Sequence, residues 1–179
     1  MLLIEIRKNY KRPVTRDTEY GIDGGRYIGM HFTPETKEHL QRIIHDEALP
    51  HPTPPEKLHT TITYSKDNAV PEYNVAGKLD EPIEAEIDSF DIFPTNDGNN
   101  CLVAKLACAE FEKRHNLTRQ MGASYDYEQY IPHITLSYNV GDISNEKLEQ
   151  LNKKYRGTRV YADEEYDEPL IDNWAKDTQ

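Results

Sequence analysis

Two short segments of the chain repeat one pattern, in which a histidine and a threonine stand two positions apart. HTTITYS, which begins at His59, and HITLSYN, which begins at His133, both read His-x-Thr-aliphatic-[Ser/Thr]-Tyr-small polar. Residues i and i+2 of a β-strand point to the same face, so His59 projects together with Thr61. His133 and Thr135 do the same on the second strand. If the two strands face each other, two imidazoles and two hydroxyls surround one point.

This set of side chains suits the cleavage of a phosphodiester. A neutral histidine can accept the proton of an attacking hydroxyl, and a protonated histidine can donate a proton to the leaving oxygen, because the ordinary pKa of imidazole is ~6.5. The hydroxyls of Thr61 and Thr135 can donate hydrogen bonds to the non-bridging phosphate oxygens. The similarity of the two motifs leaves open which histidine is the base.

A single His-x-Thr segment is most often part of an ordinary sheet. Two copies with the same flanking pattern, each closing a matched strand, helix and loop, favour the catalytic interpretation. The other histidines considered have no repeated pattern, so surface or structural roles are expected for them: His31, His45, His51 and His115. A zinc site needs three or four converging ligands, so the sequence predicts no metal and no other cofactor.

Each motif ends a unit of strand, helix and loop, and the two units have nearly equal lengths. Thr33 as N-cap and Pro34 at the first helical position predict where the first helix begins. The expected elements are strand 26–32, helix 33–49, strand 58–65, loop 66–81, strands 82–94 and 101–108, helix 109–122, strand 133–139, helix 144–157 and a final strand that runs into a tail. The repeat predicts an α+β fold of two pseudo-symmetric β-α-β lobes with a central cleft.

The composition fits one folded, polar domain. The chain has 179 residues, of which 36% are hydrophobic and 30% charged, a size typical of a single domain. Its formal net charge is −11, whereas proteins that grip long DNA or RNA through phosphates usually carry positive charge. A small nucleotide in a pocket is still compatible, since a few local groups decide its binding.

The sequence contains no apolar run close to the ~20 residues of a membrane span, and MLLIEIRKNY at its start lacks the long apolar core of a signal peptide. The chain is therefore expected in the cytoplasm, without a membrane partner. The two cysteines, Cys101 and Cys108, fall on one expected strand, which argues against a disulfide. The oligomeric state is not predicted.

The duplicated motif, HTTI from His59 and HITL from His133, resembles the signature of the two-histidine phosphoesterases. The resemblance covers about residues 26–140. Members of that family have a bilobal α+β fold with a pseudo-twofold cleft and process RNA ends, cyclic phosphodiesters or small nucleotides without a metal. The resemblance implies that the two histidines are the catalytic acid–base pair and that Thr61 and Thr135 bind phosphate.

The segment YDEPLIDNW, which ends at Trp174, resembles a narrower group, the phage anti-CBASS nucleases. These enzymes degrade the cyclic di- and trinucleotide signals of bacterial immunity. The resemblance implies that Tyr27 and Trp174 hold the bases and that Glu168 reads a base edge. These residue types suit the task, because aromatic faces stack on bases and a carboxylate accepts hydrogen bonds from an exocyclic amino group.

Structural roles for these three residues stay open at this point: a buried strand aromatic for Tyr27, a hydrophobic plug for Trp174 and a solvated acid for Glu168. The acidic run over 162–174 is expected on a solvated surface. Three tyrosines in the loop before the second motif either line the cleft or pack within the loop: Tyr125, Tyr127 and Tyr130.

We therefore expect one bilobal phosphoesterase domain over 1–179, with 1–25 as an N-terminal extension and 162–179 as an acidic tail that contributes Trp174. The expected activity is metal-independent hydrolysis of 3′–5′ linkages in cyclic di- or trinucleotides, with the 2′-hydroxyl of the substrate as nucleophile. Two alternatives stay open. One is an RNA-end 2′,3′-cyclic phosphodiesterase or RNA ligase-like enzyme, and the other is a protein that binds a cyclic nucleotide without cleaving it.

Overall fold

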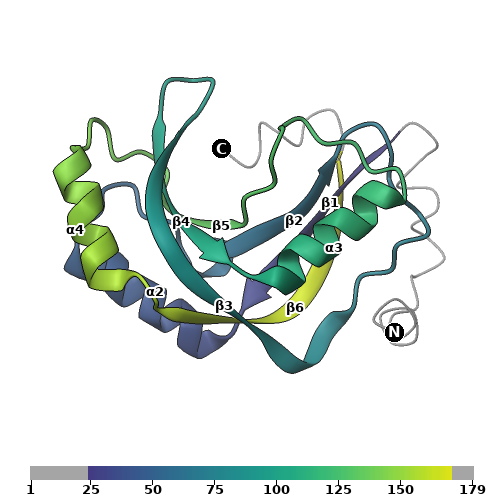
Figure 1. Cartoon of the computed structure of the whole chain (residues 1–179), viewed down its shortest axis with the longest axis horizontal. Helices are drawn as coiled ribbons and strands as arrows, with labels where there is room; N and C mark the ends of the chain where they lie inside the picture. Colours follow the sequence, from purple (N-terminus) through teal and green to yellow (C-terminus); the bar gives the residue numbers. More distant parts are fainter. Residues whose placement is uncertain (1–23, 171–179) are drawn as a thin grey trace.

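A computed structural model describes residues 24–170 (Figure 1). Most of the predicted N-terminal extension and Trp174 lie outside these residues. The elements are β1 (Gly25–Phe32), α2 (Pro34–Asp46), the short 3-10 helix η2 (Pro55–Lys57), β2 (His59–Ser65), β3 (Gly77–Pro94), β4 (Asn100–Ala107), α3 (Ala109–Gln120), β5 (His133–Ser137), α4 (Asn145–Tyr155) and β6 (Arg159–Leu170).

The six strands form one antiparallel sheet in the order β2-β1-β6-β3-β4-β5. The strands β6 and β3 pair at the centre, and the order outward from them is equivalent on the two sides. One side continues with β1 and β2, and the other with β4 and β5. The predicted α+β fold of two pseudo-symmetric lobes is confirmed, and the lobes share one continuous sheet whose two edges are the His-x-Thr strands.

Each edge strand is covered by a helix or loop from the other lobe. From α3, the Oγ1 of Thr118 lies 2.6 Å from the Oγ1 of Thr63 on β2, and His115 Nδ1 donates to the Ile62 carbonyl at 2.7 Å. On the opposite edge, the loop after α2 bonds to β5, where the Thr53 amide donates to the Leu136 carbonyl at 3.0 Å. An uncovered sheet edge would expose unpaired backbone groups, so this exchange both seals the edges and ties the lobes together.

Two of the helices, α2 and α4, begin directly after a residue whose side chain caps them. The Thr33 side chain accepts a hydrogen bond from the Thr36 amide, and the Ser144 side chain accepts one from the Lys147 amide. Such N-caps satisfy amide groups that lack a partner within the helix. α2 and α4 lie beside each other at one end of the molecule and α3 lies at the other end (Figure 1).

The apolar core lies between the sheet and the helices that cover it. Its fully buried members come from both lobes and include Ile28, Met30, Leu40, Ile62, Leu102, Phe111, Ile134 and Leu136. The aliphatic residue after each His-x-Thr is thus a core residue, as the alternation of the two strands predicts. Both cysteines are free thiols, with Cys101 half-buried and Cys108 buried.

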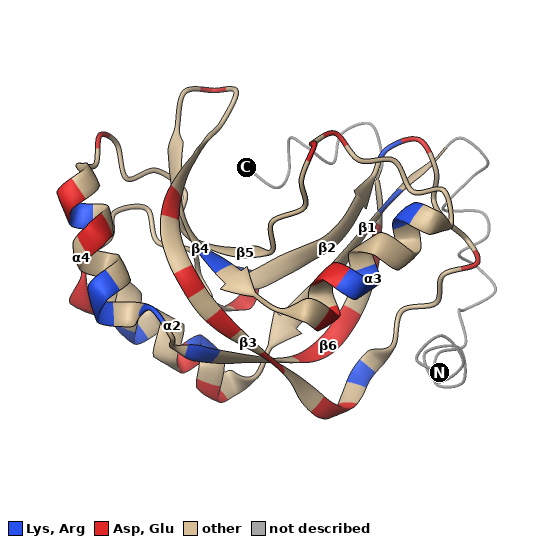
Figure 2. Ribbon diagram, in the orientation of Figure 1, with Lys and Arg blue, Asp and Glu red and all other residues tan. Residues whose placement is uncertain are grey.

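Two sequence predictions about the acidic strands need correction. β3 begins at Gly77, so residues 77–81 belong to a strand and not to the predicted loop. β6 runs from Arg159 to Leu170 in the middle of the sheet, so the acidic run is mostly a central strand. Acidic residues line both strands (Figure 2), but Glu165 is 0% and Asp167 7% exposed, so the prediction of a solvated surface is wrong for these two.

The reason is that the partners of these buried acids lie far away in sequence. Glu165 accepts hydrogen bonds from Tyr73 Oη at 2.9 Å, from Arg114 Nη1 at 2.8 Å and from the Ala76 amide at 2.8 Å. Burial without such partners would be costly for an ionised carboxylate. With them, Glu165 joins β6 to α3 and to the segment that leads into β3.

We expect Glu165→Ala to lower the free energy of unfolding by about 3–5 kcal/mol, because it leaves the buried guanidinium of Arg114 without its closest counter-charge. Urea denaturation measures this change. Glu38→Ala is the matched control: its pair with Arg42 is 75% and 60% exposed, and exposed pairs contribute about 0–1 kcal/mol. Equal effects of the two substitutions would contradict the role assigned to Glu165.

Candidate functional site

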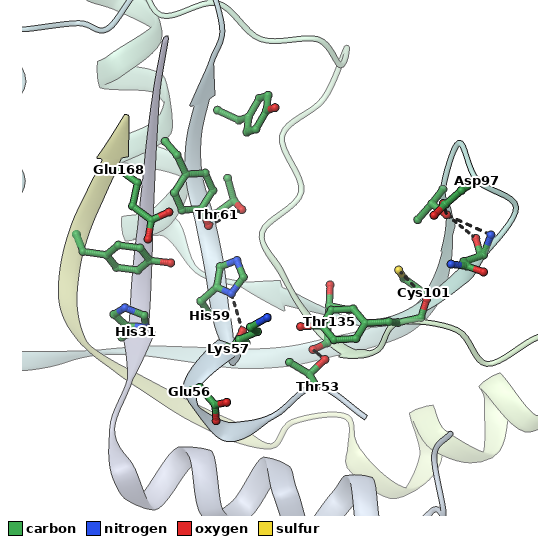
Figure 3. A pocket seen from close by; sticks show the side chains of 16 residues that line it. His31, Thr53, Glu56, Lys57, His59, Thr61, Asp97, Cys101, Thr135 and Glu168 are labelled. Atoms are coloured by element: carbon green, nitrogen blue, oxygen red, sulfur yellow. Dashed lines mark hydrogen bonds between the residues drawn. The ribbon is translucent and has the colours of Figure 1, made fainter. Parts of the chain in front are cut away.

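A cavity of about 530 Å³ lies along the two His-x-Thr strands. Five of the seven predicted site residues line it: Tyr27, His59, Thr61, Thr135 and Glu168. Figure 3 shows Glu168 on β6, Thr61 and His59 on β2, and Thr135 on β5 around the same space. Among the described residues, His133 does not belong to the cavity lining, and Trp174 lies outside the described range.

The two motif strands share an irregularity that the sequence alone did not reveal. In β2 the pairing with β1 shifts by one residue at Ile62, so that Gly29 pairs with Thr61 and Tyr27 with Tyr64. In β5 the pairing with β4 shifts in the same way at Leu136. A β-bulge adds one residue to a strand and re-aims the side chains beyond it. The tyrosine of each motif is thereby turned to the same face as the histidine and threonine.

Both catalytic candidates are held in one tautomer by the same backbone contact. His59 Nδ1 donates to the Lys57 carbonyl at 2.6 Å, and His133 Nδ1 donates to the Ile131 carbonyl at 2.8 Å. A carbonyl can only accept, so the proton of each neutral ring lies on Nδ1. Each Nε2 is then able to accept a proton, or to donate one when the ring is protonated.

The environment of the His133 ring differs from that of the His59 ring. The His133 ring lies edge-on to Phe93, with ring centroids 4.7 Å apart. Burial lowers the pKa of His133 below its usual value, and the charge of His59 lowers it further, while the bond to the Ile131 carbonyl partly offsets both. A histidine in this state is neutral at pH 7 and can act as a base.

Each of the two threonines, Thr61 and Thr135, is held in position by a residue from the opposite lobe. Tyr130 Oη donates to the carbonyl of Thr61 at 2.7 Å, and Thr53 Oγ1 donates to the carbonyl of Thr135 at 2.8 Å. Tyr130 precedes β5, whereas Thr53 precedes β2. The bonds are therefore reciprocal, and each fixes the backbone of one predicted phosphate-binding residue.

A line of hydroxyl groups leads to Thr61 from the inner strands. Tyr27 Oη lies 3.0 Å from Thr61 Oγ1, and Tyr166 is hydrogen-bonded to Tyr27. Burial raises the pKa of Tyr27, which is 4% exposed, so its hydroxyl stays neutral. If Tyr27 donates to Thr61, the threonine proton is available for a ligand in the cavity.

Glu168 on β6 is the direct strand partner of Tyr27 on β1.

Several residues in the cavity wall were missed by sequence reasoning, among them Tyr166 and His31. Their rings are stacked with centroids 3.9 Å apart and an interplanar angle of 11°. The signal available was the alternation of β6, in which Tyr166 shares a face with Glu168. The expected surface or structural role holds for His115, which is buried and hydrogen-bonded to β2. For His31 the same expectation overlooked its position in the cavity wall.

The three loop tyrosines do not line the cavity in the described part of the chain. Tyr130 stacks on His115 with centroids 4.1 Å apart, and Tyr125 meets both rings edge-on. Tyr127 is 74% exposed. Packing, one of the two roles considered for them, describes Tyr125 and Tyr130, whose rings meet His115, whereas most of Tyr127 is exposed.

Between residues 24 and 170, no group of three or more His, Cys, Asp and Glu side chains is arranged to hold a metal ion. In the same range no helix has the length and apolar character needed to cross a membrane.

The family model described as "Anti-CBASS protein Acb1" matches residues 24–177. The chain belongs to the Acb1 family. Acb1 of Salmonella phage S16 is 35% identical over 156 residues, which cover 87% of this chain and 95% of that protein. Acb1 of Enterobacteria phage T4 is 36% identical over 153 residues, which cover 86% and 93%. The predicted resemblance to the anti-CBASS proteins is confirmed.

The two solved structures described next share less sequence with this chain than these Acb1 relatives do. The crystal structure of E. coli LigT complexed with 3′-AMP has a TM-score of 0.49 and 11% identity, and the match covers 83% of this chain and 96% of that one. The crystal structure of TT0787 of Thermus thermophilus has a TM-score of 0.49 and 18% identity, with 82% and 84% covered.

In this member of the Acb1 family, Gly29 leaves room for the two tyrosines beside Thr61. A Cβ atom on Gly29 would lie 2.8 Å from Tyr166 Oη and 2.9 Å from Tyr27 Cε1. We expect Gly29→Ala to lower the free energy of unfolding by about 1–3 kcal/mol through overpacking, as measured by urea denaturation. In a Tyr166→Ala background the same substitution should cost less, because one of the two contacts is gone. Strictly additive effects would contradict this account.

Proposed function

We propose that this protein is a metal-independent phosphodiesterase that hydrolyses the 3′–5′ linkages of cyclic di- or trinucleotides. Its membership of the Acb1 family supports a phosphodiesterase with an anti-CBASS role. The observation that supports hydrolysis of cyclic di- or trinucleotides in particular is the pairing of the two His-x-Thr motifs. Each supplies a histidine with Nδ1 bound to a carbonyl and a threonine held by the opposite lobe. His59, Thr61 and Thr135 line one cavity of nucleotide-binding size, and His133 lies two residues before Thr135 on β5.

In the proposed reaction the 2′-hydroxyl of the substrate attacks the adjacent phosphorus. His133, whose partial burial favours the neutral ring, accepts the hydroxyl proton at Nε2. The bond from phosphorus to the 5′-oxygen breaks, and protonated His59 donates a proton from Nε2 to that oxygen. The first product is a linear nucleotide with a 2′,3′-cyclic phosphate. Water then opens this ring, with the two histidines in exchanged roles.

Negative charge that develops on the phosphate is met by hydroxyl donors on both sides. Thr61 and Thr135 donate to the non-bridging oxygens, and their fixed backbones mean that little reorganisation is needed at the moment of reaction. Tyr27 supports Thr61 through the bond between their hydroxyls. The proposal assigns base recognition to Tyr27 and Glu168, which are neighbours across β1 and β6, and to Trp174.

We expect His59→Ala and His133→Ala each to lower kcat/KM for 3′,3′-cyclic GMP–AMP by about 10²–10⁴-fold, because each removes one proton-transfer group. Product formation measured by liquid chromatography in the presence of EDTA tests this and metal independence together. His45→Ala is the control, because its side chain is 90% exposed on α2. A substrate without the 2′-hydroxyl should resist cleavage.

Other outcomes of that experiment identify other functions. A ligand that returns intact after the complex is denatured would favour a binding protein. Faster turnover of RNA ending in a 2′,3′-cyclic phosphate would favour the RNA-end enzyme, against which the net charge of −11 argues. Loss of all activity in EDTA would contradict metal independence.

The pH dependence of kcat/KM tests the assignment of His133 as base. The base must be deprotonated, and burial lowers the pKa of His133 below its usual 6.5, so activity should fall only as the pH drops through that lowered pKa. We therefore expect the acid limb of the profile to have its midpoint below pH 6.5. Phe93→Ala exposes the ring to water and should move the midpoint upward. A midpoint at or above 6.5 that Phe93→Ala leaves in place would contradict the assignment.

A further inference from the structure

The end of the cavity beyond Thr135 has a lining of its own, here called the hairpin subsite and made of Thr95, Asp97, Asn99, Cys101 and Tyr138. The first three come from the turn between β3 and β4, Cys101 lies on β4, and Tyr138 follows β5. Figure 3 shows Asp97 and Cys101 on one side of Thr135, with Glu168 and His31 on the far side of Thr61. The two ends of the cavity are therefore separated by the threonines.

The position of Tyr138 in the cavity follows from the repeated bulge. Tyr64 and Tyr138 occupy the same place in the two motifs, and both line the cavity. Without the extra residue at Ile62 or Leu136, the strand alternation would turn each tyrosine to the opposite face. The irregularity is thus present twice, with the same result in each lobe.

The hairpin subsite is held rigidly. The Thr95 amide donates to the Asn99 carbonyl at 2.8 Å, and the Thr95 hydroxyl donates to the Asp97 carboxylate. Asn139 Nδ2 donates to Asn99 Oδ1 at 3.2 Å, which joins the turn to the end of β5. On the other side of the subsite, the Tyr138 amide donates to the His51 carbonyl at 3.0 Å. A site that is already ordered loses little entropy when a ligand binds.

The chemistry of this lining favours a nucleoside over a phosphate. Asp97 is acidic, and the other four side chains carry no positive charge. A carboxylate repels phosphate but accepts hydrogen bonds from the exocyclic amino groups of adenine, guanine and cytosine. Tyr138, which is 37% exposed, offers an aromatic surface against which a base can stack.

We propose that the hairpin subsite binds the second nucleoside of the cyclic substrate, with Tyr138 against its base and Asp97 as acceptor for its amino group. The proposal rests on the proposed function. A phosphodiester joins two nucleosides, so a phosphate held between Thr61 and Thr135 directs one nucleoside to each end of the cavity. The nucleoside at the first end meets Tyr27 and Glu168, and the other reaches the hairpin subsite.

The test measures kcat and KM for 3′,3′-cyclic di-AMP with Tyr138→Ala. We expect KM to rise about 5- to 100-fold, the range given by loss of one stacking partner, while Tyr138→Phe stays within about twofold of wild type because it keeps the ring. Tyr161→Ala is the matched control, since Tyr161 has the same 37% exposure but lies on β6 outside the cavity lining. Circular dichroism confirms that each variant is folded.

Asp97→Asn tests the base contact separately and keeps an oxygen for the Thr95 hydroxyl. Cyclic di-AMP and 3′,3′-cyclic UMP–AMP both offer adenine to the first end, but uracil offers no amino group to the second. We expect wild type to prefer cyclic di-AMP by roughly 10-fold in kcat/KM, and Asp97→Asn to bring this ratio within about twofold of unity.

The outcomes separate the two proposals. If wild type cleaves neither cyclic dinucleotide, the proposed function fails. If wild type cleaves them but KM of Tyr138→Ala stays within twofold of wild type, the hairpin subsite is overturned and the function stands. A wild-type preference that Asp97→Asn leaves unchanged overturns the role of Asp97.

Discussion

The geometry of the site depends on the exchange of covering segments between the two lobes. Within residues 24–170, each His-x-Thr strand is an edge of the sheet, with no further strand paired beyond it. Tyr130 from the second lobe holds the Thr61 carbonyl, and Thr53 from the first lobe holds the Thr135 carbonyl. These two hydrogen bonds therefore join the lobes and fix the backbone of both threonines that are proposed to bind phosphate.

The central strand β6 shows how one segment can serve both stability and the site. Two of its acids, Glu165 and Asp167, are buried and paired with Arg114 and Arg26. The residues between and after them, Tyr166 and Glu168, line the cavity. The ion pairs on one face thus hold the strand that presents the proposed base-recognition residues on the other. The high acid content of this segment reflects internal pairing as much as solvation.

The sequence was sufficient to predict the two motif strands, the three long helices and the two-lobe arrangement, because these follow from short-range patterns and from an internal repeat. It also placed Tyr27 and Glu168 in one site through a family resemblance, and the pairing of β1 with β6 brings them together. It could not predict the place of β6, because that depends on partners distant in sequence. The bulges at Ile62 and Leu136 were also missed, since strand alternation assumes a regular strand. The places of His31 and Tyr166 in the cavity were missed because both depend on the pairing of β1 with β6, two segments that lie far apart in the sequence.

The order of the strands has a consequence for how the chain is made. Of the six described strands β6 comes last in the sequence, yet it lies between β1 and β3 in space. While the nascent chain emerges from the ribosome, β1 and β3 have no inner neighbour until residues 159–170 are available. Contacts between segments so far apart form slowly, since a long loop must close first. The sheet, and with it the part of the cavity wall that Tyr166 and Glu168 form, is therefore completed only after β6 has been translated.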